Sequence, residues 1–234
     1  MRYSIVIPCY NEAATLPSLV QRCLEVTAQT PFELEFILVD NGSVDASASV
    51  LSELLVGTQG CRSIRVTENQ GYGHGILAGL AAAKGDILGW THADMQTDPG
   101  DVLAAIALYE KHEGQIFAKG LRFGRPLADV VFTVGMSVFE TLYLRRRLWD
   151  INAQPTLFPR SFYQGWVNPP QDFALDLFAY AEARAQRMTV CRFPVRFGER
   201  KYGVSHWNVD WQSKVKFIRR TMEFSREVKR RSST

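Results

Sequence analysis

The sequence is poor in cysteine and has no long uninterrupted hydrophobic run. Its four cysteines are scattered, without a CxxC pair, which is typical of reduced thiols in a cytoplasmic protein. The N-terminal segment MRYSIVIPCYNE reaches Asn11 and Glu12 too soon for a secretory signal. The longest charge-free apolar stretch of the second half, VVFTVGMSVF, has ten residues, fewer than a bilayer-spanning helix requires. We therefore expect a cytoplasmic protein with no signal peptide and no transmembrane helix.

Glycine and proline are neither depleted nor enriched, and the charge is nearly balanced. Seventeen Gly and ten Pro among 234 residues exclude fibrous and disordered classes, and 46% hydrophobic residues suffice for one sizeable core. The net charge of +3 is uneven, because the segment from Arg196 onward carries +7 and the rest of the chain −4. A basic end predicts an anionic neighbour, a membrane or a nucleic acid, or simply a solvated helix end. No aromatic platform accompanies these basic residues, so we expect no nucleic acid.

Hydrophobic strands alternate with amphipathic helices along the first half of the chain. Strands are expected at 3–11, 32–45, 63–69 and 86–94, and helices at 12–29, 46–55, 76–85 and 100–112. After Gln115 the pattern loosens, with strands at 116–126 and 189–197 and helices at 127–148 and 172–188. This alternation predicts an α/β fold with a mainly parallel sheet flanked by helices. We expect one compact unit, with a soft boundary near residue 120.

Polar clusters follow all four early strands. They comprise residues 8–12, 40–45, 69–74 and 92–98. In parallel sheets, ligands bind beyond the carboxyl ends of the strands. A single polar strand end is explained by a capped turn, whereas four at one edge predict a ligand site.

The segment THADMQTDP carries His92, Asp94 and Gln96 at alternate positions. If the strand continues through it, these three side chains share one face. An imidazole, a carboxylate and an amide oxygen form an open site for a divalent cation, with the imidazole favouring Mn²⁺ over Mg²⁺. The pattern alone is weak evidence for a metal site, and its position after an apolar strand strengthens that evidence.

The other strand ends offer contacts for a flat polar ligand. Pro8, Tyr10 and Glu12 supply ring faces and a carboxylate, and Asp40 can accept hydrogen bonds from a base or a ribose, or cap its own turn. The turn NQGYGHG lacks the third glycine of a dinucleotide fingerprint, because position 76 is Ile76. A close backbone approach to a ligand at Gly71 remains open.

Several motifs resemble those of one known family. IVIPCYNE, ILVDNGSVD, NQGYGHGILAGLAAAKGD and THADMQTDP are similar to successive signatures of family 2 glycosyltransferases with the GT-A fold. Within that family the chain is most similar to the dolichyl- and polyprenyl-phosphate sugar transferases. The resemblance is close over residues 3–100, looser at 120–122 and 150–160, and close again at 172–183 and 192–207.

The resemblance implies a GT-A-like, Rossmann-type domain over residues 1–234. Residues 1–120 would bind the nucleotide sugar, and residues 121–234, with the basic C-terminal helix, would form the acceptor side. The implied activity is inverting transfer of a sugar from a UDP-, GDP- or CDP-sugar, as in cell-envelope synthesis. Its nucleotide-binding residues would be Pro8, Tyr10, Glu12, Asp40, Gly71 and His92.

The resemblance also implies a divalent metal, Mn²⁺ or Mg²⁺, held by His92, Asp94 and Gln96. Asp94 would be catalytic, because the metal stabilises charge on the leaving diphosphate. His92 stands where the family usually has the first aspartate of DAD. This change lowers the negative charge of the site and puts the metal dependence in doubt. His92 either ligates the metal or hydrogen-bonds a phosphate.

The acceptor implied by the resemblance is a polyprenyl phosphate. A lipid phosphate is largely ionised at neutral pH and needs cations rather than a base. Arg122, Arg125 and Arg200 are the candidate cations, with Arg200 also a catalytic candidate. Asp150 is a further catalytic candidate, either orienting an arginine or, like Asp176, acting as base for a saccharide hydroxyl. Asp172 and Asp176 also suit capping of a helix start. A catalytically weak nucleotide-sugar binding module is the remaining alternative.

Two segments predict contact with an anionic membrane surface. Residues 214–234 alternate basic residues with Phe217, Ile218, Met222 and Phe224, and residues 130–148 form an apolar helix that ends in three arginines. Both are compatible with interfacial helices. Packing of both apolar faces on the core or on a partner subunit is the alternative. We expect peripheral association with the cytoplasmic face of a membrane, and the sequence leaves the oligomeric state open.

Overall fold

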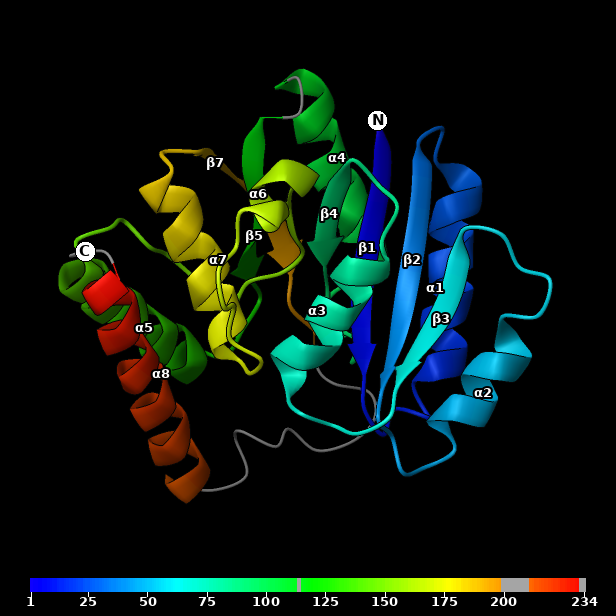
Figure 1. The fold of residues 1–234 in the computed structure, drawn as a ribbon, viewed down its shortest axis with the longest axis horizontal. Helices are drawn as coiled ribbons and strands as arrows, with labels where there is room; N and C mark the ends of the chain where they lie inside the picture. Colours follow the sequence, from blue (N-terminus) through cyan, green and yellow to red (C-terminus); the bar gives the residue numbers. More distant parts are fainter. Residues whose placement is uncertain (113–114, 199–210, 232–234) are drawn as a thin grey trace.

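The computed structural model contains one seven-stranded sheet with the order β3-β2-β1-β4-β6-β5-β7 (Figure 1). It describes residues 1–112, 115–198 and 211–231, the last segment with side chains from 219 to 229. The strands are β1 (Arg2–Cys9), β2 (Glu33–Asn41), β3 (Cys61–Val66), β4 (Ile87–Trp90), β5 (Ile116–Phe123), β6 (Thr156–Pro159) and β7 (Thr189–Arg196). Residue 120, where the sequence suggested a soft boundary, lies inside β5 and therefore inside this sheet.

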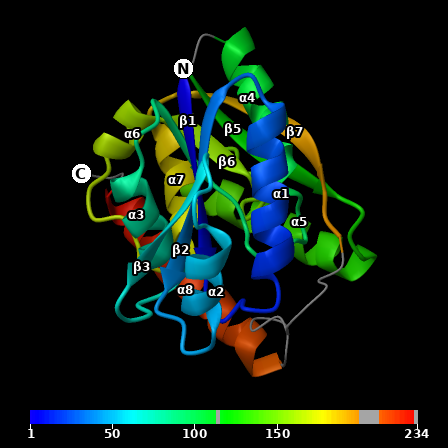
Figure 2. The same ribbon diagram turned by 90° about the vertical axis from the view of Figure 1, so that its right-hand side faces the viewer.

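Helices cover both faces of the sheet (Figure 2). One face carries α1 (Leu16–Gln29), α2 (Ser47–Leu54) and α4 (Val102–Lys111), which follows a 3₁₀ turn at Pro99–Asp101. The other carries α3 (Tyr72–Ala82), α6 (Arg160–Gln164) and α7 (Ala174–Ala185). Next to α7 lie α5 (Leu127–Leu144) and α8 (Trp211–Arg231). The expected α/β fold with helices on both faces is confirmed.

Strand β1 shows why the central strands are apolar on both sides. Its residues Tyr3, Ile5 and Ile7 pack into the core under α1 and α4, whereas Val6 packs into the core under α3 and α7. All four side chains are fully buried. A strand covered on both faces is nearly continuously hydrophobic, which explains the run in the sequence.

Strand directions place the end of β5 at the same edge as the ends of β1, β2 and β4. Strands β1 to β4 are mutually parallel, β6 runs antiparallel to both β4 and β5, and β7 is parallel to β5. Because β6 runs opposite to β4 and β5 runs opposite to β6, β5 is parallel to β4. The C-terminal ends of β4 and β5 therefore point toward the same edge of the sheet. The register sets Cys9 beside Asp40 and Val6 beside Trp90.

Strand β6 and helix α6 were not expected from the sequence. The four-residue strand TLFP lacks alternation and is buried throughout, so it gives no periodic signal. Other boundaries also differ: β4 ends at Trp90 rather than at residue 94, and α3 begins at Tyr72 rather than at Ile76.

Helix α5 is, among the described residues, the helix long and apolar enough to cross a membrane, by length and composition. The ten-residue apolar run in the sequence is shorter than this helix, because the helix continues past Asp129 and Glu140 to a length of 18 residues. Only Ser137, Glu140 and Leu144 are buried along it. The ten-residue run on which the expectation of no transmembrane helix rested is thus part of a longer helix, and that expectation stays a prediction. Helix α5 presents most of its surface outward.

Candidate active site

The HxDxQ segment is a turn and not the end of a strand. The β4 ladder ends at Trp90, and the amide of Thr91 makes a last bond to the Val6 carbonyl at 3.0 Å. Met95 then adopts a left-handed conformation (φ 57°), and Asp94 Oδ1 accepts a hydrogen bond from the Gln96 amide at 3.1 Å. The expectation of alternate side chains on one strand face was therefore wrong. The chain reverses here because a short carboxylate can bond the backbone two residues on.

The three predicted metal ligands nevertheless lie in one short loop just beyond β4. His92, Asp94 and Gln96 are all partly exposed. Gln96 Nε2 donates to the carbonyl of Gly198 at 3.2 Å, so its Oε1 is the atom that can reach a cation. Within the described ranges, no three His, Cys, Asp or Glu side chains group as a metal site would require. A cation bound here would complete its coordination with diphosphate oxygens or water.

The loops after β1 and β2 are joined into one rim by hydrogen bonds. The amide of Asn11 donates to Ser43 Oγ at 3.1 Å, and the amide of Val44 donates to Asn11 Oδ1 at 3.0 Å. The amide of Glu12 donates to Ser47 Oγ at 3.0 Å. Tyr10, at the top of this rim, is 40% exposed. The sequence cluster is thus partly structural, and it holds the Tyr10 ring where a planar ligand can contact it.

Asp40 has one oxygen in a turn and one at the sheet edge. Its carboxylate is buried, and Oδ1 accepts from the Ser43 amide at 2.9 Å. Oδ2 lies 3.2 Å from Arg65 Nε as an ion pair, without the alignment of a hydrogen bond. The structure therefore supports the turn-capping interpretation of Asp40, and its contact with a nucleotide stays a prediction.

Buried oxygens without hydrogen-bond partners lie at the end of β2 and in the segment after β4. In the described part of the chain they include Asp40 Oδ2, Asn41 Oδ1, Thr91 Oγ1 and Thr97 Oγ1. Buried polar atoms in native proteins are nearly always hydrogen-bonded. These four oxygens are available to water or to a bound polar group, and Arg125 Nε, Gln154 Oε1, Trp166 Nε1 and Arg192 Nε are further such atoms elsewhere in the described residues.

The glycine-rich turn before α3 is explained by packing within the protein. Gly71 has φ 121°, and a Cβ there would lie 2.5 Å from the Gln171 carbonyl oxygen. A Cβ on Gly73 would lie 2.7 Å from the Asp172 carbonyl oxygen. The amide of His74 donates to the Gln171 carbonyl at 2.8 Å. The contact that requires these glycines is therefore with residues 171–172, and the nucleotide role of Gly71 stays a prediction.

Tyr72 is a site residue that sequence reasoning missed. Its ring stacks on Phe173 with centroids 4.9 Å apart, and it lies 6.1 Å from the His92 ring at an interplanar angle of 30°. Its hydroxyl accepts a hydrogen bond from Gln154 Nε2. An aromatic residue inside a Gly-Tyr-Gly turn was the available signal. Tyr72 connects the HxDxQ loop with the acceptor half.

Asp150 is held by an arginine pair. Its carboxylate accepts from the Arg122 amide at 2.9 Å and from Arg122 Nε at 3.0 Å, and Arg125 Nη2 lies 3.7 Å away. Burial raises the pKa of Asp150, but the hydrogen bonds and charge of Arg122 outweigh it and hold that pKa below its usual range. A general base works best with a pKa near the operating pH. The geometry therefore favours the orienting role of Asp150 over the base role.

Asp176 lies beneath the site in a buried polar network. It is 3.6 Å from Lys119 Nζ and accepts from Trp90 Nε1 at 3.4 Å. Lys119 is fully buried and donates to Thr156 Oγ1 at 2.9 Å. Burial lowers the pKa of Lys119 to about 8, with Asp176 opposing the shift. Because Asp176 is buried too, its position favours a structural role. Asp172, before α7, accepts from the Ala174 amide at 2.9 Å and pairs with Arg220 of α8 at 2.9 Å.

A short bridge joins the arginine pair to the HxDxQ loop. The Arg122 guanidinium lies over the Phe197 ring, 5.4 Å from its centroid. The next residue, Gly198, donates its amide to the Gln96 carbonyl at 2.7 Å and accepts from the Gln96 side chain. The candidate donor and acceptor residues are thus adjacent at one edge of the sheet. Arg200 lies outside the described residues.

Comparison with known proteins decides the family. The model of glycosyl transferase family 2 matches residues 4–157. The chain belongs to glycosyl transferase family 2. The matched range covers the sheet edge just described, from β1 through Arg122 and Asp150 to the start of β6. The expectation of a family 2 glycosyltransferase is confirmed.

Curated relatives of this family 2 chain are named undecaprenyl-phosphate 4-deoxy-4-formamido-L-arabinose transferase. The protein from Pseudomonas fluorescens (strain SBW25) is 39% identical over 101 residues, 42% of this chain and 29% of the relative. The protein from Enterobacter sp. (strain 638) is 35% identical over 153 residues, 64% of this chain and 42% of the relative. The matches span less than half the length of these relatives.

Solved structures confirm the GT-A fold. Glucosyl-3-phosphoglycerate synthase from Mycobacterium tuberculosis in complex with phosphoglyceric acid superposes with a TM-score of 0.73, covering 97% of this chain and 79% of that chain at 16% identity. The same enzyme in complex with Mn²⁺, UDP and glucosyl-3-phosphoglycerate gives a TM-score of 0.69, covering 94% and 77% at 17% identity. At this identity the likeness concerns the fold alone.

Proposed function

We propose that this family 2 protein transfers a sugar, with inversion, from a nucleoside diphosphate sugar to a polyprenyl phosphate. The supporting observation is the adjacency of two unlike groups at one sheet edge. The HxDxQ loop beyond β4 supplies Asp94, and the end of β5 supplies Arg122. Phe197 and Gly198 connect them through the contacts described above. Such an arrangement suits a diphosphate on one side and an anionic acceptor on the other.

On the donor side, the exposed Tyr10 ring and the available oxygen of Asp40 bind the nucleoside, with Pro8, Glu12 and Gly71 around them. His92, Asp94 and Gln96 face the diphosphate. One carboxylate, one imidazole and one amide oxygen fit Mn²⁺ better than Mg²⁺. A bound metal would supply Lewis-acid stabilisation of the negative charge that develops on the leaving diphosphate. Solved neighbours of the same fold that were determined with Mn²⁺ and UDP support this choice.

On the acceptor side, the protein supplies positive charge and no evident base. Arg122 and Arg125 face one carboxylate, Asp150, which leaves a net charge of +1 in a mostly buried cluster. Arg125 Nε is buried without a hydrogen-bond partner. An ionised phosphate meets this cluster directly and needs no deprotonation. A saccharide hydroxyl would need a base, and both Asp150 and Asp176 are occupied. The names of the curated relatives agree with a lipid phosphate acceptor, and Arg200 remains a third candidate contact.

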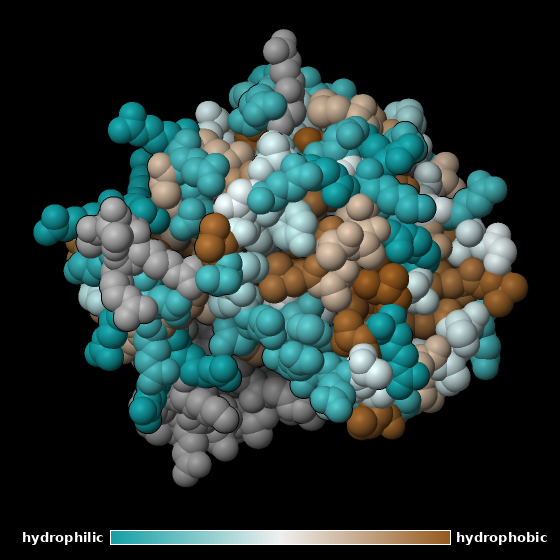
Figure 3. All heavy atoms as spheres, in the orientation of Figure 1, coloured by the Kyte–Doolittle hydropathy of each residue, from teal (hydrophilic) through white to brown (hydrophobic). Residues whose placement is uncertain are grey.

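The protein acts at a membrane surface in this proposal, lying on it through α5. The outer face of α5 exposes Leu127, Val131, Val138 and Leu142, and arginines 145 and 147 follow its end. By contrast, the coloured part of the surface near α8 is mostly hydrophilic in Figure 3, and Arg219, Arg220 and Glu223 are exposed there. Phe224 of α8 packs on Phe178 and is buried, so part of the apolar face of α8 is turned inward. Side chains 217 and 218 lie outside the described residues.

Donor binding tests the proposal through thermal unfolding. A ligand that binds only the folded state raises its apparent stability, so we expect one of UDP-, GDP- or CDP-sugars to raise Tm, and more so with Mn²⁺. Asp94→Ala is expected to remove the Mn²⁺-dependent increment and sugar transfer together. Glu53→Ala, at an exposed carboxylate on α2, serves as control and should change neither.

Two outcomes would contradict the proposal. If no nucleotide sugar shifts Tm, or if Asp94→Ala transfers sugar as fast as the unmodified protein, the donor assignment is wrong. If a nucleotide sugar binds with Mn²⁺ but is neither hydrolysed nor transferred to any prenyl phosphate or saccharide, the chain is a nucleotide-sugar binding module.

A further inference from the structure

Phe173 is an exposed aromatic residue at the start of α7. It precedes the helix directly and is 55% exposed. Its ring is nearly parallel to that of Tyr72, with centroids 4.9 Å apart and an interplanar angle of 12°. A parallel stack at this distance covers one face of each ring. In the described part of the chain, the exposed area of Phe173 therefore belongs to its other face and its edge.

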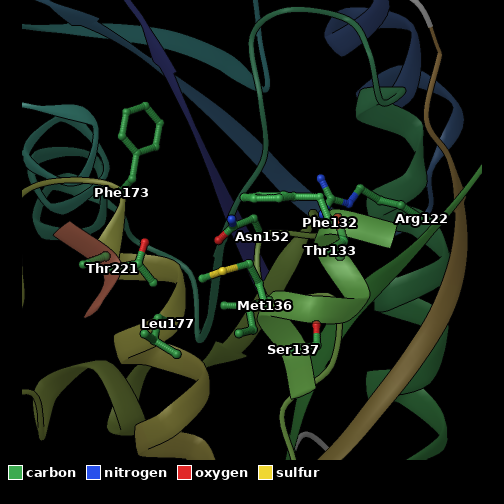
Figure 4. Close-up of a pocket in the computed structure, with 11 residues that line it drawn as sticks. Arg122, Phe132, Thr133, Met136, Ser137, Asn152, Phe173, Leu177 and Thr221 are labelled. Atoms are coloured by element: carbon green, nitrogen blue, oxygen red, sulfur yellow. The ribbon is translucent and has the colours of Figure 1, made fainter. Parts of the chain in front are cut away.

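The Phe173 ring lies between the donor side and the acceptor side of the candidate site. On the donor side, Tyr72 lies 6.1 Å from the His92 ring of the HxDxQ loop. On the acceptor side, Phe173 and Arg122 line one pocket, and Figure 4 shows them on opposite sides of it with Asn152 between them. In the proposed function, a sugar that passes from a diphosphate at the HxDxQ loop to an anionic acceptor therefore passes this ring.

Two sets of contacts hold the ring in place. The Tyr72 hydroxyl accepts a hydrogen bond from Nε2 of Gln154, which is fully buried. The backbone before Phe173 packs on the start of α3, where the His74 amide donates to the Gln171 carbonyl at 2.8 Å. A surface that is fixed before its ligand arrives loses little conformational freedom on binding. Phe173 is thus a preorganised apolar surface beside the polar HxDxQ loop.

The face of an aromatic ring matches one part of a nucleotide sugar chemically. The diphosphate is anionic and gains nothing from a ring face, which also carries negative charge. The nucleoside, which can also stack on a ring, is assigned to Tyr10 and Asp40 at the ends of β1 and β2. A pyranose carries apolar, slightly positive C–H groups on its faces. Packing such a face on the ring removes apolar area from water and brings these C–H groups to the negative ring face.

We propose that the open face of Phe173 binds the transferred sugar, a pyranose that lies on the ring with a face free of axial hydroxyl groups. The inference rests on the proposed function and gives the sugar its place in it. Tyr72 is a positioning residue that supports the ring from the other side. A hydroxyl directed at the ring would lose its hydration without gaining a hydrogen bond, so Phe173 discriminates between sugars by their configuration on this face.

Comparing sugar diphosphates with the diphosphates alone tests the inference. The probes are UDP-glucose, UDP-galactose, UDP-xylose, GDP-mannose and CDP-glucose, each compared with UDP, GDP or CDP by titration calorimetry in the presence of Mn²⁺. Phe173→Ala and Phe173→Leu remove the ring, and the leucine keeps apolar volume at the start of α7. Phe173→Tyr keeps the ring. Phe123→Ala is the control, at a phenylalanine that is 52% exposed and points to the opposite face of β5 from Arg122.

The two variants without the ring should bind the sugar diphosphate more weakly and the diphosphate as before. For the sugar diphosphate that binds the unmodified protein most tightly, we expect Kd to rise by about three- to tenfold, the contribution of one stacked ring. Kd for the matching diphosphate should not change, because the ring contacts only the sugar. Phe173→Tyr and Phe123→Ala should leave both Kd values unchanged.

Three outcomes would contradict the inference. An equal rise in Kd for the sugar diphosphate and the diphosphate, or no rise for either, would overturn it and leave the proposed function intact. A higher KM for citronellyl phosphate with an unchanged Kd for the sugar diphosphate would also overturn it, because Phe173 would then contact the acceptor. Failure of every probe to bind the unmodified protein would contradict the proposed function, and the inference with it.

Discussion

At the scale of single residues, the site depends on how one carboxylate is shared between two arginines. Asp150 is buried and accepts three hydrogen bonds from Arg122, with Arg125 at 3.7 Å. Removal of one partner from a buried ion pair costs more than the pair contributes, since a charge is left uncompensated. The ionised Asp150 carboxylate therefore helps to hold both guanidiniums, beside the contacts of Arg125 with Thr133 and of Arg122 with Phe197.

Asp150→Asn is expected to loosen Arg122 rather than to remove a base. The KM for the lipid phosphate should rise, Tm should fall, and kcat should fall by less than the roughly 10²–10⁴-fold typical of a lost general base. Steady-state kinetics and thermal unfolding measure all three. Asp129→Asn, which removes a charge near Arg125 but leaves the Arg122–Asp150 pair, is the control. A 10²–10⁴-fold loss of kcat with unchanged KM and Tm would instead identify Asp150 as a base.

The order of residue types in the sequence predicted the position of the HxDxQ segment but not its backbone conformation. The alternation of His92, Asp94 and Gln96 fits a strand equally well, and the Asp94 side chain decides for a turn by bonding the Gln96 amide. The reason for Gly71 was also hidden, because its close contact is with Gln171, a hundred residues away. Tyr72 was missed for the same reason, since its partner Phe173 comes from the same distant segment.

At the scale of elements, α5 and α8 are joined through a buried carboxyl group. Glu140 of α5 is fully buried, and Ser225 Oγ of α8 lies 2.7 and 2.8 Å from its two oxygens. Burial raises the pKa of Glu140 to about 7, with the Ser225 hydrogen bond opposing the shift. The unfolded chain releases this proton near an ordinary pKa of about 4.3. The folded state thus holds more protons between these values, and stability falls as pH rises from about 4 to about 7.

Glu140→Gln should remove this pH-dependent loss of stability, because the amide does not titrate. The side-chain oxygen of Gln can still accept the hydrogen bond from Ser225 Oγ. We expect the variant to be more stable than the unmodified protein at pH 8, by roughly 1–3 kcal/mol, and about equally stable near pH 4.5. Thermal unfolding across pH 4.5–8 measures the difference. Glu223→Gln, at an exposed position on α8, should show no such trend. Parallel curves for Glu140→Gln and the unmodified protein would mean that Glu140 is ionised when buried.

Most long elements were predictable because their periodicity is strong, as in α1 and α7. The element that gave no signal, β6, is only four residues long and buried on both faces. Its pairing with β4 and β5 depends on residues more than 30 positions away. The sequence suggested a sheet and its mainly parallel character, but tertiary contacts alone insert a reversed strand between β4 and β5.

At the scale of the whole molecule, charge and apolar surface are unevenly distributed. The segment from Arg196 onward carries a net charge of +7, and the rest of the chain carries −4. The exposed apolar face of α5 lies beside α8, whose exposed side chains include Arg219 and Arg220. The charge asymmetry was readable from the sequence. The position of the basic side chains of α8 next to α5 could not be predicted from the sequence, since it depends on the packing of α5 against α8.

Vesicle flotation measures the membrane contact. At low salt we expect the protein to float with anionic vesicles and much less with zwitterionic ones, and salt should weaken binding by screening the basic surface. Val131→Asp combined with Leu142→Asp on α5 should abolish flotation, whereas Val56→Asp should not. Absence of the protein from the anionic vesicle fraction at low salt would refute the membrane contact.

The inserted strand β6 also determines a length in the active site. Adjacent strands are about 4.8 Å apart, so β6 separates Trp90, at the end of β4, from Lys119 of β5 by about 10 Å. The HxDxQ loop follows Trp90, and Arg122 lies three residues beyond Lys119. In the proposed function, the sugar therefore crosses the start of β6 when it passes from the diphosphate to the acceptor phosphate.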